Sequence, residues 1–299
     1  MKRVTLTVAL GALTAATVFA AAKKGVTMPT EGEIAKIRAA APAKPPAEPK
    51  EPRRVLVWGH VWTHAPNPYC DEAMKILGEK TGAWKATLSD DPTDLLAESL
   101  AAYDALVMNN IHERNPFLPE GLGSLPKEEQ EKARAVDAAV KKSILAFVRG
   151  GKGIAGIHAA TAALQTWPEY GEMMGGYYGG HIVGDVPIKL DDPGHPVNAC
   201  FGGKGWRIND EIYIFRDPYS RKRLRVLLSL DLDRMKDPGK RPDKDYAVSW
   251  VRRWGKGRVF YCSLGHNAAT YWNPAFLKHV LAGMQFVLGD LDGPTEPTE

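Results

Sequence analysis

The segment GIAGIHAA (residues 153–160) places a histidine between a short apolar run and a run of small residues. Residues 153–157 are apolar or glycine, which is typical of a buried strand. Small residues on both sides of His158 permit a sharp strand-to-helix turn that lifts one side chain above the end of a sheet. A histidine lifted in this way can act as a base, an acid or a metal ligand. In the structural alternative, His158 only caps the helix that follows.

Strand-like and helical segments alternate on both sides of this turn. The expected strands are residues 54–59, 84–88, 104–109 and 153–157, and the expected helices are residues 71–80, 93–100, 127–148 and 159–174. This alternation predicts an α/β fold with a doubly wound, mostly parallel, flavodoxin-like sheet. From residue 187 the pattern changes to short strands at 187–190, 211–215, 224–230 and 246–254, which predict an antiparallel extension. An apolar strand at 258–263 and a helix at 275–288 close the domain.

The two ends of the chain differ in composition from the middle. Residues 1–22 combine a basic start, an uncharged apolar run and an alanine-rich exit, as a secretory signal peptide does. The run is short for a membrane helix, which is the alternative. Residues 23–53 are rich in Ala, Pro, Lys and Glu and are expected to form an extended linker. We expect the domain to span residues 54–290, a flexible tail to span 291–299, and the protein to be secreted or periplasmic, with no membrane span after signal removal.

Charge and cysteine content exclude several classes of function. The chain carries a net charge of +4, but residues 1–54 hold a surplus of basic side chains, so the folded part is mildly acidic and gives no case for nucleic-acid binding. Three cysteines (Cys70, Cys200 and Cys262) do not make a disulfide framework. The turn after the first strand lacks the glycine spacing of a dinucleotide site, so no nucleotide cofactor is expected.

Polar side chains gather where four predicted strands end. They are His60, Trp62 and His64 after the first strand, Asn109, Asn110 and His112 after the third, His158 and Thr161 after the fourth, and His266 and Asn267 after the last. Ligands of open α/β sheets bind at the carboxyl ends of the strands. We therefore expect these remote histidines to share one site, with His195 and His279 in structural roles.

Three longer segments resemble a known family. They are GGKGIAGIHAATAALQTWPEYGEMMGGYYGGH (residues 150–181), NDEIYIF (209–215) and SLGHNAATYWNPAFLKHVLAGMQFVLG (263–289). In this order they are similar to the ThuA-like, or trehalose-utilisation, family. The resemblance implies a fold related to class I glutamine amidotransferases. Those enzymes carry a nucleophilic cysteine at the sharp turn between strand and helix. Here that cysteine is absent and His158 stands in its place, so the resemblance does not extend to glutamine hydrolysis.

The resemblance and the strand-end residues together define a candidate site. The resemblance carries over His158, His181, Glu211 with Tyr213, and His266 with Tyr271. We expect His158, His266 and His181 to be catalytic, and His158, His181, Glu211 and His266 to hold a divalent metal such as Zn²⁺. His158 can be the base or a ligand, but not both. The expected substrate-binding residues are Asn110, Thr161, Trp167, Tyr213, Tyr271 and His60.

Two functions fit these residues. The family is associated with disaccharide use alongside dehydrogenases that make 3-keto sugars, so one hypothesis is a lyase or hydrolase that acts on a keto-sugar or glycoside by histidine acid/base chemistry. The alternative is a non-catalytic sugar- or metal-binding module of a carbohydrate-utilisation system. Hydrolysis by a facing pair of carboxylates has little support, because the strand ends carry histidines instead.

Overall fold

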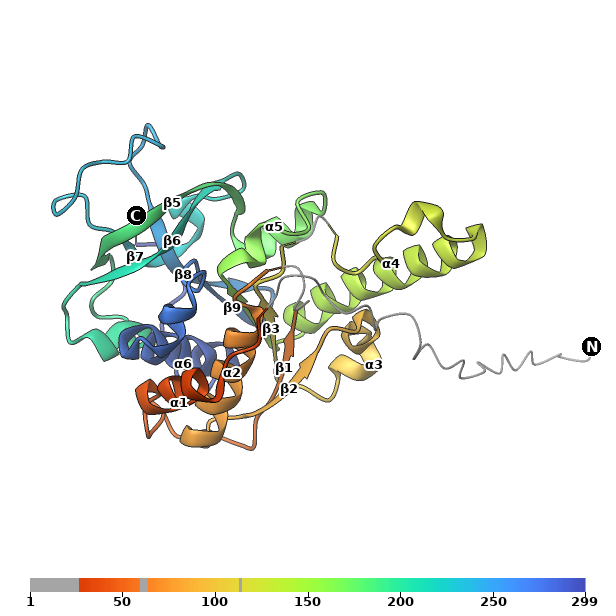
Figure 1. Ribbon diagram of the computed structural model, residues 1–299, viewed down its shortest axis with the longest axis horizontal. Coiled ribbons are helices and arrows are strands. Elements are labelled where there is room, and N and C mark those ends of the chain that lie inside the picture. The colour runs from red at the N-terminus through yellow and green to blue at the C-terminus, as the bar shows by residue number, and fades with distance from the viewer. Residues whose placement is uncertain (1–26, 60–63, 113–114, 299) are drawn as a thin grey trace, which may run out of the picture.

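The structure is a computed structural model that describes residues 27–59, 64–112 and 115–298 (Figure 1). The signal-peptide prediction for residues 1–22 falls outside these ranges. In the described part, no helix is both long enough and apolar enough to cross a membrane.

Nine strands of the described chain form a single sheet. They are β1 (Arg54–Trp58), β2 (Lys85–Ser89), β3 (Ala105–Asn109), β4 (Gly153–Ile157), β5 (Tyr177–Leu190), β6 (Trp206–Arg216), β7 (Arg225–Leu230), β8 (Ala247–Trp254) and β9 (Gly257–Cys262). The order is β2-β1-β3-β4-β9-β8-β7-β5-β6. The pairs from β2 to β9 are parallel and the pairs from β9 to β6 are antiparallel. The predicted parallel sheet with an antiparallel extension is thus confirmed.

Helices cover both faces of the sheet. They are α1 (Glu31–Ala40), α2 (Asn67–Thr81), α3 (Ala97–Leu100), α4 (Lys127–Arg149), α5 (Pro168–Met174) and α6 (Pro274–Leu288), with short 3-10 turns η1 (Pro92–Leu95), η2 (Leu122–Ser124), η3 (His158–Thr161), η4 (Pro196–Phe201), η5 (Arg221–Arg223) and η6 (Ala268–Trp272). Strand β1 shows how the faces separate, because its side chains alternate between two cores. Val55 and Val57 pack in the core with α1, α2 and α6, whereas Leu56 and Trp58 pack in the core with α4 and α5. Figure 1 labels these helices around the sheet.

The segment after β4 is not the single helix that the sequence predicted for residues 159–174. It forms η3, a loop and then α5, which begins at Pro168. A residue before proline is pushed out of the helical region, and Trp167 is extended, with φ −115° and ψ 90°. The backbone after His158 therefore makes a 3-10 turn and a loop before the helix begins.

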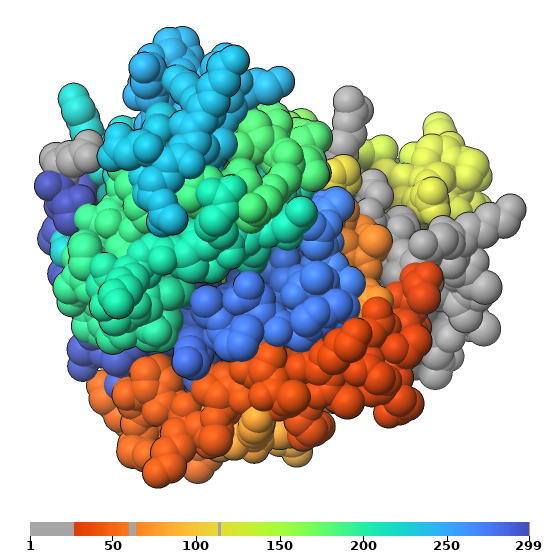
Figure 2. Space-filling model, turned by 60° about the vertical axis from the view of Figure 1, so that its left-hand side comes forward, coloured from red at the N-terminus to blue at the C-terminus, as the bar shows by residue number. Residues whose placement is uncertain are grey.

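The segment before β1 is docked, so the prediction of an extended linker over residues 23–53 is wrong for its described part. Helix α1 begins with a capping box between Thr30 and Glu33, and Ile37 is fully buried against the domain. Beyond α1, the backbone N–H of Ala47 donates to Oε1 of Gln285 in α6 (3.0 Å). Figure 2 shows this N-terminal segment, in red and orange, lying along the body of the molecule. The sequence composition did not reveal these specific anchors.

The C-terminal segment is also held against the domain, where a flexible tail was expected for residues 291–299. The Arg258 guanidinium donates to Asp292 (2.7 Å), and Nε2 of His195 lies 3.0 Å from the carbonyl oxygen of Pro294. This contact gives His195 the structural role that the sequence suggested.

Strands β5 and β6 form a long antiparallel arm at one end of the sheet. The sequence predicted only residues 187–190 of β5, because Gly179, Gly180 and Gly184 obscure the alternating pattern of the preceding residues. The arm reaches the carboxyl end of β9, where the N–H of Tyr213 donates to Oγ of Ser263 (2.8 Å). Side chains of the arm therefore meet those at the ends of the parallel strands.

Candidate functional site

His158 stands on a strained turn at the end of β4, as the sequence predicted. Its φ is +45°, a conformation that non-glycine residues rarely adopt and that is concentrated at functional sites. Gly156 makes the close packing of this turn possible, because a Cβ there would lie 2.2 Å from the Cε of Met174. The side chain of His158 is fully buried.

One hydrogen bond determines which nitrogen of His158 is free. Nδ1 lies 2.6 Å from the carbonyl oxygen of Ser263, which can only accept, so Nδ1 carries the proton. Nε2 is then unprotonated and carries a lone pair, and it has no hydrogen-bond partner in the described part of the chain. Burial, with a smaller effect of neighbouring histidines, holds the pKa of His158 well below its usual range. The ring is therefore neutral and offers a buried nitrogen as a metal ligand.

His64 and His266 complete a three-histidine cluster. The ring centroid of His64 lies 5.2 Å from those of His158 and His266, and the latter two are 5.3 Å apart. One nitrogen of each ring lies within 4.8 Å of the others. Burial lowers the pKa of His64 to about 3, and its Nδ1 has no hydrogen-bond partner among the described residues. Two unpartnered buried nitrogens in one cluster fit the donor set of a first-row metal ion.

The turn that carries His266 is held by a buried carboxylate. Asp210 of β6 is fully buried and accepts the backbone N–H groups of Gly265 (2.7 Å), His266 (3.1 Å) and Asn267 (2.8 Å). Burial raises the pKa of Asp210, and the N–H groups of Gly265 and Asn267 oppose that shift. Three donors on one carboxylate fix the backbone of the turn, and with it the position from which the His266 side chain projects.

Asn267 determines which ring nitrogen of His266 carries the proton. Its amide Nδ2 donates to the carbonyl oxygen of Asn209 (3.0 Å), which leaves Oδ1 to accept from Nδ1 of His266 (3.3 Å). Nε2 of His266 is then the unprotonated nitrogen. His266 and His158 thus present the same ring atom to the site, each through an acceptor on its Nδ1.

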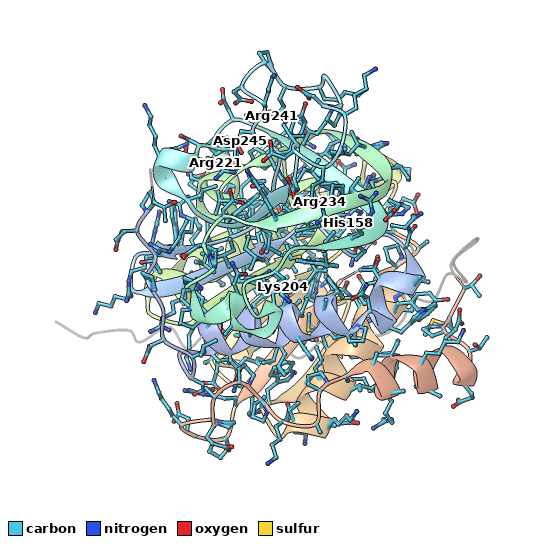
Figure 3. All side chains as sticks on the ribbon, turned by 90° about the vertical axis from the view of Figure 1, so that its left-hand side faces the viewer. His158, Lys204, Arg221, Arg234, Arg241 and Asp245 are labelled. Atoms are coloured by element: carbon cyan, nitrogen blue, oxygen red, sulfur yellow. The ribbon has the colours of Figure 1, made fainter. Side chains whose placement is uncertain are left out.

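The β5–β6 arm supplies the acidic residue of the site. Glu211 is 12% exposed, and its carboxylate oxygens lie 3.7 Å from Nε2 of His158, 3.8 Å from Nε2 of His181 and 3.9 Å from Nε2 of His266. Tyr213, two residues along the same strand, packs its ring on that of His158 with 4.4 Å between centroids. Figure 3 shows His158 beside the strands of this arm.

His181 belongs to the outer side of the site. Its side chain is 44% exposed, and its Nδ1 lies 2.8 Å from Oη of Tyr178. His112 is also exposed and stacks on His64 with 5.3 Å between ring centroids. The structure therefore brings together His158, His266, His181 and Glu211, but the three residues whose geometry could hold a metal ion include His64 and not His181 or Glu211, which the sequence analysis had placed there.

Several residues expected to bind substrate lie beneath the site. Thr161, Tyr271 and Asn110 are buried, and Trp167 is 7% exposed among Phe117 and Tyr170. Thr161 Oγ1 lies 3.0 Å from Oη of Tyr261, and Tyr271 donates to the carbonyl oxygen of Gly265 (2.9 Å) while Asn110 donates to Tyr271 (3.0 Å). Thr161, Tyr271 and Asn110 therefore support the walls of the site, and Trp167 belongs to the core that packs with α4 and α5. Tyr213 lies against His158, and His60 falls outside the described residues.

Sequence reasoning missed the parts played by three residues. His64 had been noted with His60 after the first strand, in a loop that varies within the family, and it was not placed among the expected metal ligands. Asp210 precedes Glu211 in the NDEIYIF segment, so its position was visible although its role was not. Tyr178 lies within the quoted motif of residues 150–181, but only the structure shows its contact with His181.

This chain is similar to known proteins at the level of a family model and of solved structures. A family model described as ThuA, trehalose utilisation, matches residues 54–287. A ThuA-like protein from Bacteroides uniformis superposes with a TM-score of 0.61 at 19% identity, covering 80% of this chain and 93% of the other. A ThuA-like protein from Parabacteroides merdae gives 0.56 at 17% identity, with 82% and 93% covered. No curated protein matches.

Proposed function

This chain belongs to the ThuA family of trehalose utilisation, and from that premise we propose that it is an enzyme that acts on a keto-sugar or glycoside by metal-assisted acid/base chemistry. The observation that carries the proposal is the cluster of His64, His158 and His266, whose ligand nitrogens lie within 4.8 Å of one another. Neutral imidazoles are the ligands that Zn²⁺ and other first-row divalent ions take in catalytic sites.

The fit of a metal rests on the donor atoms. Nε2 of His158 and Nδ1 of His64 are buried without a partner in the described structure, which is costly unless something occupies the space between them. The Ser263 carbonyl orients His158 as the outer partner of a metal-bound histidine does. These contacts favour His158 as a ligand over His158 as a base.

A keto-sugar suits this site for a chemical reason. A ketone makes the neighbouring C–H acidic, and removal of that proton forms an enolate. A metal ion supplies a positive charge at the oxygen where that negative charge develops. If a glycosidic oxygen leaves from the next carbon, the C–H electron pair becomes a carbon–carbon double bond, the C–O bond breaks and the leaving oxygen takes up a proton. This route needs one proton-transferring group and one cation, and it does not need a pair of carboxylates.

Export is a further part of the proposal. The first 22 residues have the charge and apolar pattern of a signal peptide, which supports a secreted or periplasmic protein. N-terminal sequencing of the protein purified from its native host checks this. A mature chain that begins near residue 23 supports export, whereas an intact start contradicts it.

The experiment for the reaction uses a methyl 3-keto-glucoside with added Zn²⁺. We expect the wild-type protein to release methanol or to exchange the proton next to the ketone with solvent, and we expect His158→Ala to lose this activity together with the metal. Tight binding of the sugar without any chemical change in it would instead support the non-catalytic module. Equal turnover by both proteins would remove His158 from the mechanism.

A further inference from the structure

The histidines of the site fall into two groups with different surroundings. His64 and His158 are held inside the domain, and both have depressed pKa values because of burial. His266 belongs to the same cluster although its side chain is 38% exposed, and His181, which is 44% exposed, lies on the arm, outside the three-histidine cluster. A residue that moves protons to and from a substrate needs access to it, whereas a metal ligand does not.

The register of the arm places His181 above the inner site. His181 pairs with Tyr213 and Val183 pairs with Glu211, so these four side chains share one face of the two-stranded arm. On that face Tyr213 contacts the ring of His158, and Glu211 lies within 4 Å of His158, His181 and His266. His181 therefore faces the same space as His158 and His266.

A β-bulge adds Tyr178 to this face. In a regular strand, residues three apart point to opposite faces, but the register shifts between Tyr178 and Gly180. Tyr178 consequently meets His181 through a hydrogen bond of 2.8 Å and packs edge-on against Tyr213, with 4.5 Å between ring centroids. Bulges next to active sites commonly redirect one side chain in this way.

We propose that His181 is the proton-transferring residue of this site, that Tyr178 positions it, and that His64, His158 and His266 hold the metal. The inference rests on the proposed function and assigns the step that the proposed function left open. Nε2 of His181 removes the proton next to the ketone. The resulting imidazolium donates from Nδ1 to the hydroxyl oxygen of Tyr178 and faces the Glu211 carboxylate with Nε2. His181 then returns the proton to the leaving oxygen.

The partners of His181 suit both states of its ring. With Nε2 bare in the neutral ring, Nδ1 carries the proton, so the Tyr178 hydroxyl oxygen accepts from Nδ1 in the neutral ring and in the imidazolium alike. Burial and the nearby Glu211 raise the pKa of Tyr178, so its hydroxyl keeps its proton throughout. The Glu211 carboxylate, 3.8 Å from Nε2, stabilises the positive ring by charge.

The test separates metal binding from proton transfer in one set of variants. The variants are His181→Ala, His181→Gln, Tyr178→Phe, His158→Ala and Asp185→Asn, the last an exposed residue of the same strand that pairs with Arg207 at 2.9 Å. Each protein is loaded with Zn²⁺, and bound zinc is measured by elemental analysis. Deuterium uptake from D₂O next to the ketone of methyl 3-keto-glucoside is followed by NMR.

We expect both His181 variants to bind zinc as the wild type does and to lose deuterium uptake by at least about 100-fold. His181→Gln keeps a polar group beside Tyr178, so a loss shared with His181→Ala is not a collapse of the arm. Tyr178→Phe should lower the exchange rate about tenfold at saturating sugar, with KM and zinc unchanged, because it acts through His181. Asp185→Asn should match the wild type.

Two results would overturn the inference alone. Loss of zinc in the His181 variants, to the degree seen in His158→Ala, would make His181 a ligand. Wild-type exchange rates in His181→Gln would remove it from proton transfer. A wild-type protein that binds zinc but neither exchanges the proton nor releases methanol would overturn the proposed function, and this inference with it.

Discussion

Nδ1 of His158 donates to the carbonyl oxygen of Ser263 across 2.6 Å, and this contact joins the ends of two neighbouring parallel strands at the centre of the site. The same serine accepts the N–H of Tyr213 through its hydroxyl, so it also ties the arm to β9. One residue thereby fixes the tautomer of His158 and the position of the strand that carries Glu211. The orientation of His158 thus depends on a backbone carbonyl, which substitution of the Ser263 side chain leaves in place.

Asp210 offers a test of how the turn around His266 is held. Replacing it with asparagine removes the charge and leaves one acceptor oxygen, so an N–H₂ group faces at least one of the three backbone N–H donors. Outer partners of metal-ligating histidines are worth about 10- to 100-fold in metal affinity, and we expect a loss in that range. Zinc titration of Asp210→Asn against Asp185→Asn measures it. Equal affinities for both variants would mean that the turn keeps its shape without the carboxylate.

Ile37 tests whether the N-terminal helix is part of the folded domain in solution. Its side chain is fully buried, so Ile37→Ala should lower the free energy of unfolding by roughly 2–5 kcal/mol. Met28 is 61% exposed, and Met28→Ala should change it by less than about 0.5 kcal/mol. Urea unfolding of both variants supplies the comparison. An Ile37→Ala protein as stable as the wild type would show that α1 does not pack on the domain.

The sequence predicted the framework well because the parallel strands carry strong local signals. Residues 153–157 are apolar, small and followed by His158, and the observed strand has the same bounds. The arm was harder, since glycines in β5 hide its alternation. Helix α1 was missed because the Ala- and Pro-rich composition of residues 39–52 suggested an extended linker for the whole segment. What holds α1 on the domain is the contact of Ile37 with residues distant in the sequence, which composition does not reveal.

The site could be predicted only in outline. His158 and His266 were placed correctly because strand ends converge on one edge of the sheet. Whether a side chain at that edge faces the site or the core depends on tertiary packing, so Tyr271 and Thr161 could not be distinguished from surface residues. His64 follows from the path of a loop, which a pattern of residue types does not determine.

The buried His279 predicts how stability varies with pH away from the site. Its Nε2 lies 2.9 Å from Oγ of Ser249, and burial lowers its pKa to about 3, against about 6.5 in an unfolded chain. As pH falls below 6.5, His279 becomes protonated in the unfolded chain but stays neutral in the folded chain. Stability is therefore lost between about pH 6.5 and pH 3. From pH 7 to pH 5 this residue alone should cost roughly 2 kcal/mol.

The measurement is urea unfolding of the wild type and of His279→Gln at both pH values. The glutamine amide can still donate to Ser249 but does not titrate, so the variant should lose roughly 2 kcal/mol less on acidification. Other buried histidines contribute equally to both proteins and cancel in the difference. Identical pH dependence of the two proteins would show that His279 is accessible to protons in the folded state.

The most direct test of the account is the metal content of the protein purified without a histidine tag and equilibrated with Zn²⁺. The cluster predicts one tightly held ion per chain, and removal of that ion by a chelator should abolish turnover of the keto-sugar. His64→Ala, His158→Ala and His266→Ala should each weaken binding by more than about 100-fold, whereas His279→Gln should not. A wild-type protein that holds zinc no more tightly than the variant lacking all three imidazoles would contradict the account.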